Sequence, residues 1–322
     1  MIGRITGAVG CMLLSLASAT AAATNSHAEL ERVARDLAAW LPGEYSTYPQ
    51  VYLERRLGAM PEGEHGDWYR VFGRIEAPQL APIVFYSELR SGGPEGVLVG
   101  EPLLYVLTID DAQRAVELRS RRLLDARKLR SVLTRPALWS RLALDPHDVA
   151  DCILLWRRYG AQLRGIAGEG GCAAAPEGPS QKRRLELEWL LDPDELWILE
   201  AGRRDQTHTR FFKARRFDCS AVLAARGRPA TRTFSLHDRG GRSWIRQDGG
   251  GGEQVELLRG LLPFGDPPQL RRQIWLTLYR QPGNTIVASS MELAGGDGRI
   301  ALEAGDTQLS CEPAPAGPGG LR

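Results

Sequence analysis

Short runs in which apolar and polar residues alternate constrain the fold of this chain more than any other feature of its sequence. In residues 184–191, for example, Leu185, Leu187 and Trp189 alternate with Glu186 and Glu188. Side chains along a strand point to opposite faces in turn, so each such run predicts a half-buried strand. Ten runs are identified, over residues 45–53, 68–76, 82–90, 103–110, 113–121, 152–158, 161–167, 184–191, 195–202 and 207–217.

Ten short strands joined mostly by tight turns favour an antiparallel barrel, because closing the sheet removes its exposed edges. A β-sandwich is the alternative. One helix precedes the strands: residues 27–41 carry Leu30, Val33, Leu37 and Leu41 at helical spacing, and Pro42-Gly43 end it. The prediction is a mainly β, antiparallel barrel domain over residues 28–220 with an N-terminal helix.

A second, smaller β-rich unit is predicted over residues 228–312. It contains three pairs of strand-like runs joined at Arg-Gly-Gly, Pro-Gly-Asn and Gly-Asp turns, and the glycines of residues 247–254 are expected to form a flexible loop. The Pro- and Gly-rich residues 313–322 are predicted to be a disordered tail.

The first 25 residues have the features of a cleavable secretory signal. Arg4 precedes an apolar run from Ile5 to Leu16, and Ala-x-Ala sites follow. A membrane anchor is the alternative, but the run is short for a bilayer; a lipoprotein site at Cys11 is less favoured because the run continues past it. We therefore expect an exported protein, periplasmic or secreted, with no membrane span after cleavage.

Cleavage would leave four cysteines, and an even number in an exported chain predicts two disulfides. Three pairings are open. We expect Cys152 to pair with Cys172, across the open end of one hairpin, and Cys219 to pair with Cys311, at the two ends of the C-terminal unit.

Composition and motifs exclude several classes of protein. The 41 basic and 39 acidic residues give a net charge of +2, so the chain as a whole does not favour nucleic acid. The basic residues 119–135 are interpreted as an amphipathic segment with a solvated face. Nucleophile-elbow, zinc-protease and phosphate-loop motifs are absent and the five histidines are scattered, so we predict no metal site.

The order of several short motifs resembles the T-type phycobiliprotein chromophore lyases, the CpcT/CpeT family. The resemblance spans roughly residues 30–217. It rests on the helix ending in LAAWLPGEYSTYPQV, on FYSEL, on DDAQRAVEL, and on LDPHDV before a cysteine. It continues through the series Cys152, Trp156, Gly160, Gly165, Cys172 and the strand pair RLELEWLLDPDELWILEAGRRD.

Such a resemblance implies a calycin-like antiparallel barrel that binds an open-chain tetrapyrrole, a bilin, and attaches it to a cysteine of an acceptor protein, with no other cofactor. It implies that Arg114 pairs with a propionate and that Glu200 faces the pyrrole N–H groups. Tyr86 and Glu88 would be wall residues, Arg203 or Arg204 a substitute for a family arginine, and Cys172 the family's second cysteine. Glu200, Arg114 and Cys172 are thus the candidate catalytic residues.

The chain also departs from the family pattern. It keeps one arginine in DAQR where the family has two, and Glu200-Ala201-Gly202 replaces an Asp-Arg-Gly turn. Transfer to an acceptor cysteine is therefore expected to be weak or absent. Two alternatives to a lyase remain: an exported carrier of a small hydrophobic ligand, and a non-enzymatic envelope module, either of them as a monomer or a homodimer.

Overall fold

The computed structural model describes residues 27–58, 65–125, 132–146, 152–168, 186–200, 207–225, 228–248, 251–264, 269–293 and 298–315. The predicted signal over residues 1–25 and most of the predicted tail over residues 313–322 lie outside them. No helix among the residues described is both long enough and apolar enough to cross a membrane.

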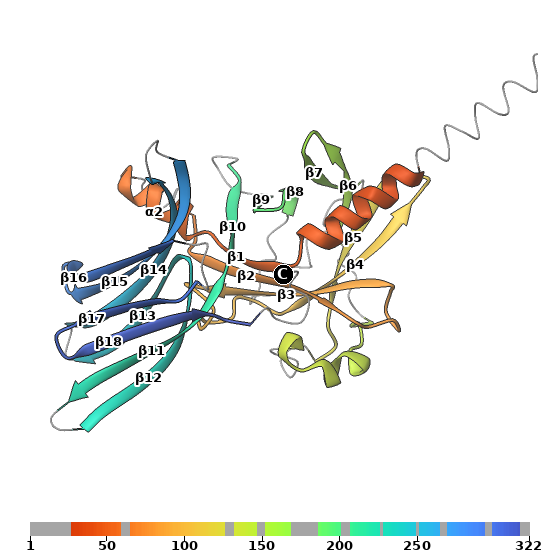
Figure 1. The fold of residues 1–322 in the computed structure, drawn as a ribbon. Helices are drawn as coiled ribbons and strands as arrows, with labels where there is room; N and C mark the ends of the chain where they lie inside the picture. The colour runs from red at the N-terminus through yellow and green to blue at the C-terminus, as the bar shows by residue number, and fades with distance from the viewer. Residues whose placement is uncertain are drawn as a thin grey trace, which may run out of the picture.

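Ten antiparallel strands close into a barrel after a helix over residues 27–40 (Figure 1). Around the barrel the strands follow the order β1-β10-β9-β8-β7-β6-β5-β4-β3-β2. The mainly β fold class with a closed barrel is confirmed. The barrel strands are β1 (Gly43–Ser46), β2 (Trp68–Ile75), β3 (Ile83–Ser91), β4 (Leu103–Asp110), β5 (Ala115–Arg122), β6 (Cys152–Tyr159), β7 (Gln162–Ala167), β8 (Glu186–Leu191), β9 (Glu195–Glu200) and β10 (Thr209–Ala214).

The first predicted strand, residues 45–53, is wrong beyond Ser46. There the chain leaves the barrel and forms helix α2 (Tyr48–Arg56). Pro49 lies in the first turn of this helix, where its missing N–H costs nothing, and Val51 is its one buried residue. Two short 3-10 helices, η2 (Val132–Thr134) and η3 (Pro136–Arg141), lie between β5 and β6.

Gln50 of α2 continues the pairing of the short strand β1 through its side chain. Its Oε1 accepts a hydrogen bond from the backbone N–H of Arg210 at 2.7 Å, and its Nε2 donates to the carbonyl of His208 at 3.2 Å. The amide thus supplies β10 with the donor and the acceptor that a further residue of β1 would have supplied. The backbone groups of Arg210 and His208 therefore keep hydrogen-bond partners where β1 ends.

Changing Gln50 to Ala should lower the free energy of unfolding by about 2 to 3 kcal/mol, because two partly buried backbone groups lose their partners. Urea unfolding measures the loss. Gln113→Ala is the control, since the side chain of Gln113 is exposed and donates to the nearby Asp110, and the change should alter stability by less than about 0.5 kcal/mol. Equal effects of the two substitutions would contradict this role of Gln50.

The barrel has two distinct ends. The turns at residues 111–114, 160–161 and 192–194 lie at one of them, here called the proximal end, together with the helix over residues 27–40. His27 lies 2.8 Å from Asp111 and Asp36 pairs with Arg158, so the helix is bound to one of these turns and to the end of β6. The distal end is the opposite one, where β9 ends and β10 begins.

Aromatic side chains fill the barrel next to this helix. They form one interior cluster with Leu37 and Leu41, which come from the helix and the residue after it and are fully buried. The ring centroids of Trp156 and Trp189 lie 6.1 Å apart, edge to face, and Phe72 lies 5.8 Å from Trp189. The proximal half of the barrel is therefore a packed core rather than an empty cup.

The Trp156 and Gly165 positions of the sequence motif are explained by packing. The two residues lie directly opposite each other on β6 and β7. A Cβ at position 165 would lie 2.6 Å from the indole of Trp156, so only glycine leaves room for this ring.

The C-terminal unit consists of two four-stranded sheets that face each other around one core, as in a sandwich. One sheet has the order β12-β11-β18-β17 and the other β13-β14-β15-β16. The strands are β11 (Arg216–Ala225), β12 (Arg228–His237), β13 (Arg239–Asp248), β14 (Gly251–Phe264), β15 (Gln269–Gln281), β16 (Thr285–Leu293), β17 (Ile300–Ala304) and β18 (Thr307–Pro313).

The predicted boundary between the two units is misplaced. β10 ends at Ala214 and β11 begins at Arg216, so the boundary lies at Arg215 and not between residues 220 and 228. Between those two bounds the chain continues in β11 as far as Ala225, which pairs with Arg228 of β12. β14 begins at Gly251, inside the segment expected to be a flexible loop.

Two arginines of the sandwich attach it to the end of β10. Arg239 Nε and Arg259 Nη2 both donate to the carbonyl of Lys213, at 2.9 and 3.1 Å. Asp238 pairs with Arg259 at 3.2 Å and accepts the backbone N–H of Arg215 at 2.8 Å. These bonds satisfy the backbone where the chain passes from the barrel into the sandwich.

Candidate functional site

Arg70 carries a positive charge into the interior of the barrel. Alternation along β2 places Trp68, Arg70 and Phe72 on the inner face, and Arg70 is 6% exposed. Its guanidinium carbon lies 4.9 Å from the ring centroid of Phe72 and 5.0 Å from that of Trp189. Two aromatic faces thus hold the cation by the attraction between a cation and a π system.

Hydroxyl groups fix the orientation of the same guanidinium. Arg70 Nη2 donates to the hydroxyl of Tyr105 at 2.6 Å, and Nε donates to Ser87 Oγ at 3.5 Å. Tyr105 is itself packed edge-on against Phe72. A planar cation with several donors, held rigidly inside a barrel, is suited to bind a carboxylate.

Glu200 occupies the inner face of the distal end. It is the last residue of β9, two positions after Ile198 and four after Leu196, both of which belong to the interior cluster. Arg70 is the third residue of β2 counted from the same end. The distal half of the barrel therefore carries both a cation and a carboxylate on its inner face.

Arg114 does not share this half of the barrel. It lies in the exposed turn between β4 and β5, with a positive φ of 48°, and its carbonyl accepts a hydrogen bond from Arg157 Nε at 3.2 Å. That turn is at the proximal end. The structure does not bring Arg114 and Glu200 together, so the pair inferred from the resemblance cannot contact one small ligand.

Tyr86 and Glu88 are wall residues of the barrel, but on its outer face. They alternate with the inward Phe85 and Ser87, and Tyr86 packs in a separate cluster beneath residues 132–144. The Tyr86 hydroxyl donates to Glu88 Oε1 at 2.6 Å, and Arg90 donates to Glu88 Oε2 at 2.5 and 3.1 Å. The packing of Tyr86 in this cluster holds residues 132–144 on the barrel, while these bonds of Glu88 join residues of β3.

One predicted disulfide is confirmed, and part of the other lies outside the residues described. Cys219 on β11 and Cys311 on β18 stand directly opposite each other and are bonded. Cys152 is also disulfide-bonded. Cys172 and Arg203 lie outside the described residues, so the pairing of Cys152 with Cys172 and the role of Arg203 stay predictions.

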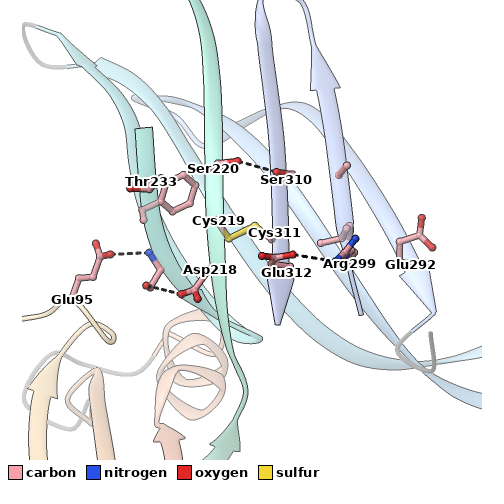
Figure 2. A pocket seen from close by; sticks show the side chains of 14 residues that line it. Glu95, Asp218, Cys219, Ser220, Thr233, Glu292, Arg299, Ser310, Cys311 and Glu312 are labelled. Atoms are coloured by element: carbon pink, nitrogen blue, oxygen red, sulfur yellow. Dashed lines mark hydrogen bonds and ion pairs between the residues drawn. A yellow bond between two sulfur atoms is a disulfide. The ribbon is translucent and has the colours of Figure 1, made fainter. Parts of the chain in front are cut away.

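Figure 2 shows a groove of about 750 Å³ on the sandwich. Glu95, from the connection between β3 and β4, borders it and accepts the backbone N–H of Ser235 at 2.8 Å. Of the charged residues that line it, four are acidic and one is basic: Glu95, Asp218, Glu292, Glu312 and Arg299. The negative charge of this groove disfavours an anionic ligand. Arg70, inside the barrel, favours one.

Among the residues that the structure describes, no three His, Cys, Asp or Glu side chains are grouped so that they could hold a metal ion. In comparisons with known proteins, no family model matches the chain and no curated protein matches it significantly. The geometry of the barrel is therefore the main evidence for its function.

Proposed function

We propose that the barrel binds an amphipathic organic anion in its distal half, with an open-chain tetrapyrrole as the first candidate. The observation that carries the proposal is Arg70, a buried guanidinium clamped by Phe72, Trp189 and Tyr105. A guanidinium held rigidly in one orientation recognises a carboxylate through its planar set of N–H donors.

The chemistry of a bilin suits the two inner-face charges. Its propionates need a cation, for which Arg70 takes the place first given to Arg114. Its pyrrole N–H groups need a carboxylate, for which Glu200 is the candidate. The resemblance to the CpcT/CpeT family supports this ligand, and export, as expected from the first 25 residues, would bring the site to a ligand outside the cytoplasm.

Binding is better supported than transfer. Forming the thioether requires an acceptor thiol beside the bound ligand, and catalysis would come mainly from positioning. The chain lacks one arginine and the Asp-Arg-Gly turn of the family motifs, and these differences disfavour transfer of the ligand to a thiol. Bilin attachment to an acceptor cysteine is therefore the second part of the proposal. It is tested separately by mixing ligand, protein and an acceptor peptide and measuring the mass of the peptide by mass spectrometry.

Changing Arg70 to Met should weaken bilin binding by about 1.5 to 3 kcal/mol, which is tenfold to over a hundredfold in Kd, because a charge-assisted hydrogen bond is lost. Titration followed by the red absorption band of the bilin measures the affinity. Methionine keeps the apolar stem but removes the charge and the hydrogen bonds to Tyr105 and Ser87, so circular dichroism of the variant must accompany the titration.

Two further variants separate charge from packing. Arg70→Lys keeps the cation and should restore part of the affinity. Arg114→Ala changes an exposed turn residue and should leave the affinity within about twofold. The proposed site would be excluded if Arg70→Met left the Kd for the bilin unchanged, or if Arg114→Ala raised it as much as Arg70→Met.

A smaller apolar carboxylate is the second candidate ligand, and the packed proximal half favours it. The rings of Trp156 and Trp189 fill the barrel next to the helix, so a ligand would have to enter from the distal end. If a fatty acid binds through Arg70 while bilins do not, the protein is a carrier. If neither binds, the barrel is a structural module.

A further inference from the structure

The end of the β14–β15 hairpin projects beyond its sheet. The two strands pair as far as Phe264 with Gln269, but β13 accompanies β14 only to Leu258, and β16 accompanies β15 only to Gln273. Residues 259–264 and 269–272 therefore form a two-stranded ribbon without neighbouring strands among the described residues.

This ribbon exposes leucines on both of its faces. Leu261 is 57%, Leu262 42% and Leu270 69% exposed. Leu261 and Leu262 are consecutive in a strand and point to opposite faces, while Leu270 lies opposite Pro263 and shares the face of Leu261. A flat protein partner would cover one face only, whereas a layer of lipid headgroups surrounds both.

Arginines accompany these leucines. Arg271 and Arg272 lie directly across the ribbon from Leu262 and Leu261, and both are exposed. A ribbon that combines uncovered leucines with two cations matches the surface of an anionic membrane, where phosphates lie next to acyl chains.

Helix α2 adds a second element of the same composition. It lies beside the base of the hairpin, since the Tyr48 hydroxyl donates to Glu256 Oε1 on β14 at 2.9 Å, and Figure 1 shows both elements at one corner of the molecule. Leu53 and Leu57 of this segment are 57% and 77% exposed, and Arg55 and Arg56 stand in its last turn.

We propose that this leucine–arginine corner, residues 52–57 with residues 261–264 and 269–272, docks the protein on the surface of an anionic phospholipid membrane. The leucines enter the boundary between headgroups and acyl chains, and the arginines bind phosphate oxygens. The docking is peripheral and is independent of any ligand of the barrel.

Sedimentation with phospholipid vesicles tests the proposal. The purified protein should bind vesicles that contain phosphatidylglycerol, and should bind pure phosphatidylcholine vesicles at least about tenfold more weakly, with an affinity that falls as salt rises. Leu261→Asp with Leu270→Asp should lower the affinity for anionic vesicles about tenfold or more. Arg271→Glu with Arg272→Glu should also lower it about tenfold and remove most of the salt dependence.

Val97→Asp is the matched control, because Val97 is 76% exposed but lies in the connection between β3 and β4 of the barrel. It should bind vesicles as the unchanged protein does. The proposal fails if the unchanged protein does not bind anionic vesicles at low salt, or if Val97→Asp weakens binding as much as the leucine pair. It also fails if the leucine pair only dissociates a dimer, which would make the corner an interface between two copies.

Discussion

Replacing Cys219 and Cys311 together by alanine should lower the free energy of unfolding by about 4 to 5 kcal/mol. The disulfide joins residues that are 92 positions apart, so it closes nearly the whole sandwich into one loop. In the chain-entropy description, a crosslink stabilises by restricting the unfolded chain, and a loop of this length gives about that value. Urea unfolding of the two proteins, followed by tryptophan fluorescence and circular dichroism, measures the difference.

The neighbouring pair Ser220 and Ser310 provides the control. Their hydroxyls lie 2.9 Å apart on the same two strands, one residue from each cysteine, and they are exposed. Changing both serines to alanine removes a contact between β11 and β18 without opening a loop, and should cost less than about 1 kcal/mol. If the cysteine pair costs no more than the serine pair, the bridge does not restrict the unfolded chain.

The barrel could be predicted from the sequence because burial on one face forces a period of two. β6 and β7, for example, occupy Cys152–Tyr159 and Gln162–Ala167, against predicted runs of 152–158 and 161–167. Helix α2 gave no such signal, because Val51 is its single buried residue and a helix that buries one side chain has no apolar stripe.

The boundary between the units was missed because β11 and β12 alternate in the same way as the barrel strands. In β11, Phe217, Cys219 and Ala221 are buried, while Asp218 and Ser220 face outward. That alternation predicts a strand but not the sheet to which it belongs. Assignment to the sandwich depends on pairing with β18, about 90 residues later, which local pattern does not encode.

The interior cation could have been found by alternation alone. Trp68 and Phe72 mark the inner face of β2, and Arg70 stands between them at the same parity. The resemblance instead implied that Arg114 is the ligand's cation. Arg114 comes just before the first residue of β5 and therefore lies in a turn. The order of the motifs implied a barrel, which the structure has. It did not predict the direction in which individual side chains point.

His237 makes the stability of the protein depend on pH. It is 1% exposed at the junction of barrel and sandwich, where its ring lies 5.1 Å from that of Tyr69 and its Nδ1 accepts the backbone N–H of Arg239. Burial, and secondarily the charge of Arg239, lower the pKa of His237 from 6.5 to about 3. The folded protein therefore keeps this imidazole neutral at pH values where the unfolded chain protonates it.

Because the unfolded state binds the extra proton, stability falls as the pH falls from about 6.5 to about 3. Burial also raises the pKa values of Glu44 and Asp238 at the same junction, and these two groups act in the opposite direction by favouring the folded state in acid. The contribution of His237 must therefore be measured as a difference between two proteins that share the other groups.

Changing His237 to Asn keeps a hydrogen-bond acceptor for the N–H of Arg239 but cannot take up a proton. Relative to the variant, the unchanged protein should lose about 2 kcal/mol of unfolding free energy between pH 7 and pH 5, and about 4 to 5 kcal/mol by pH 3, since one pKa unit corresponds to about 1.4 kcal/mol. Urea unfolding of both proteins across this range gives the difference directly. Parallel stability curves would show that His237 is protonated in the folded state as readily as in the unfolded chain. A difference that grows toward low pH would show that protonation of His237 lowers the stability of the folded protein.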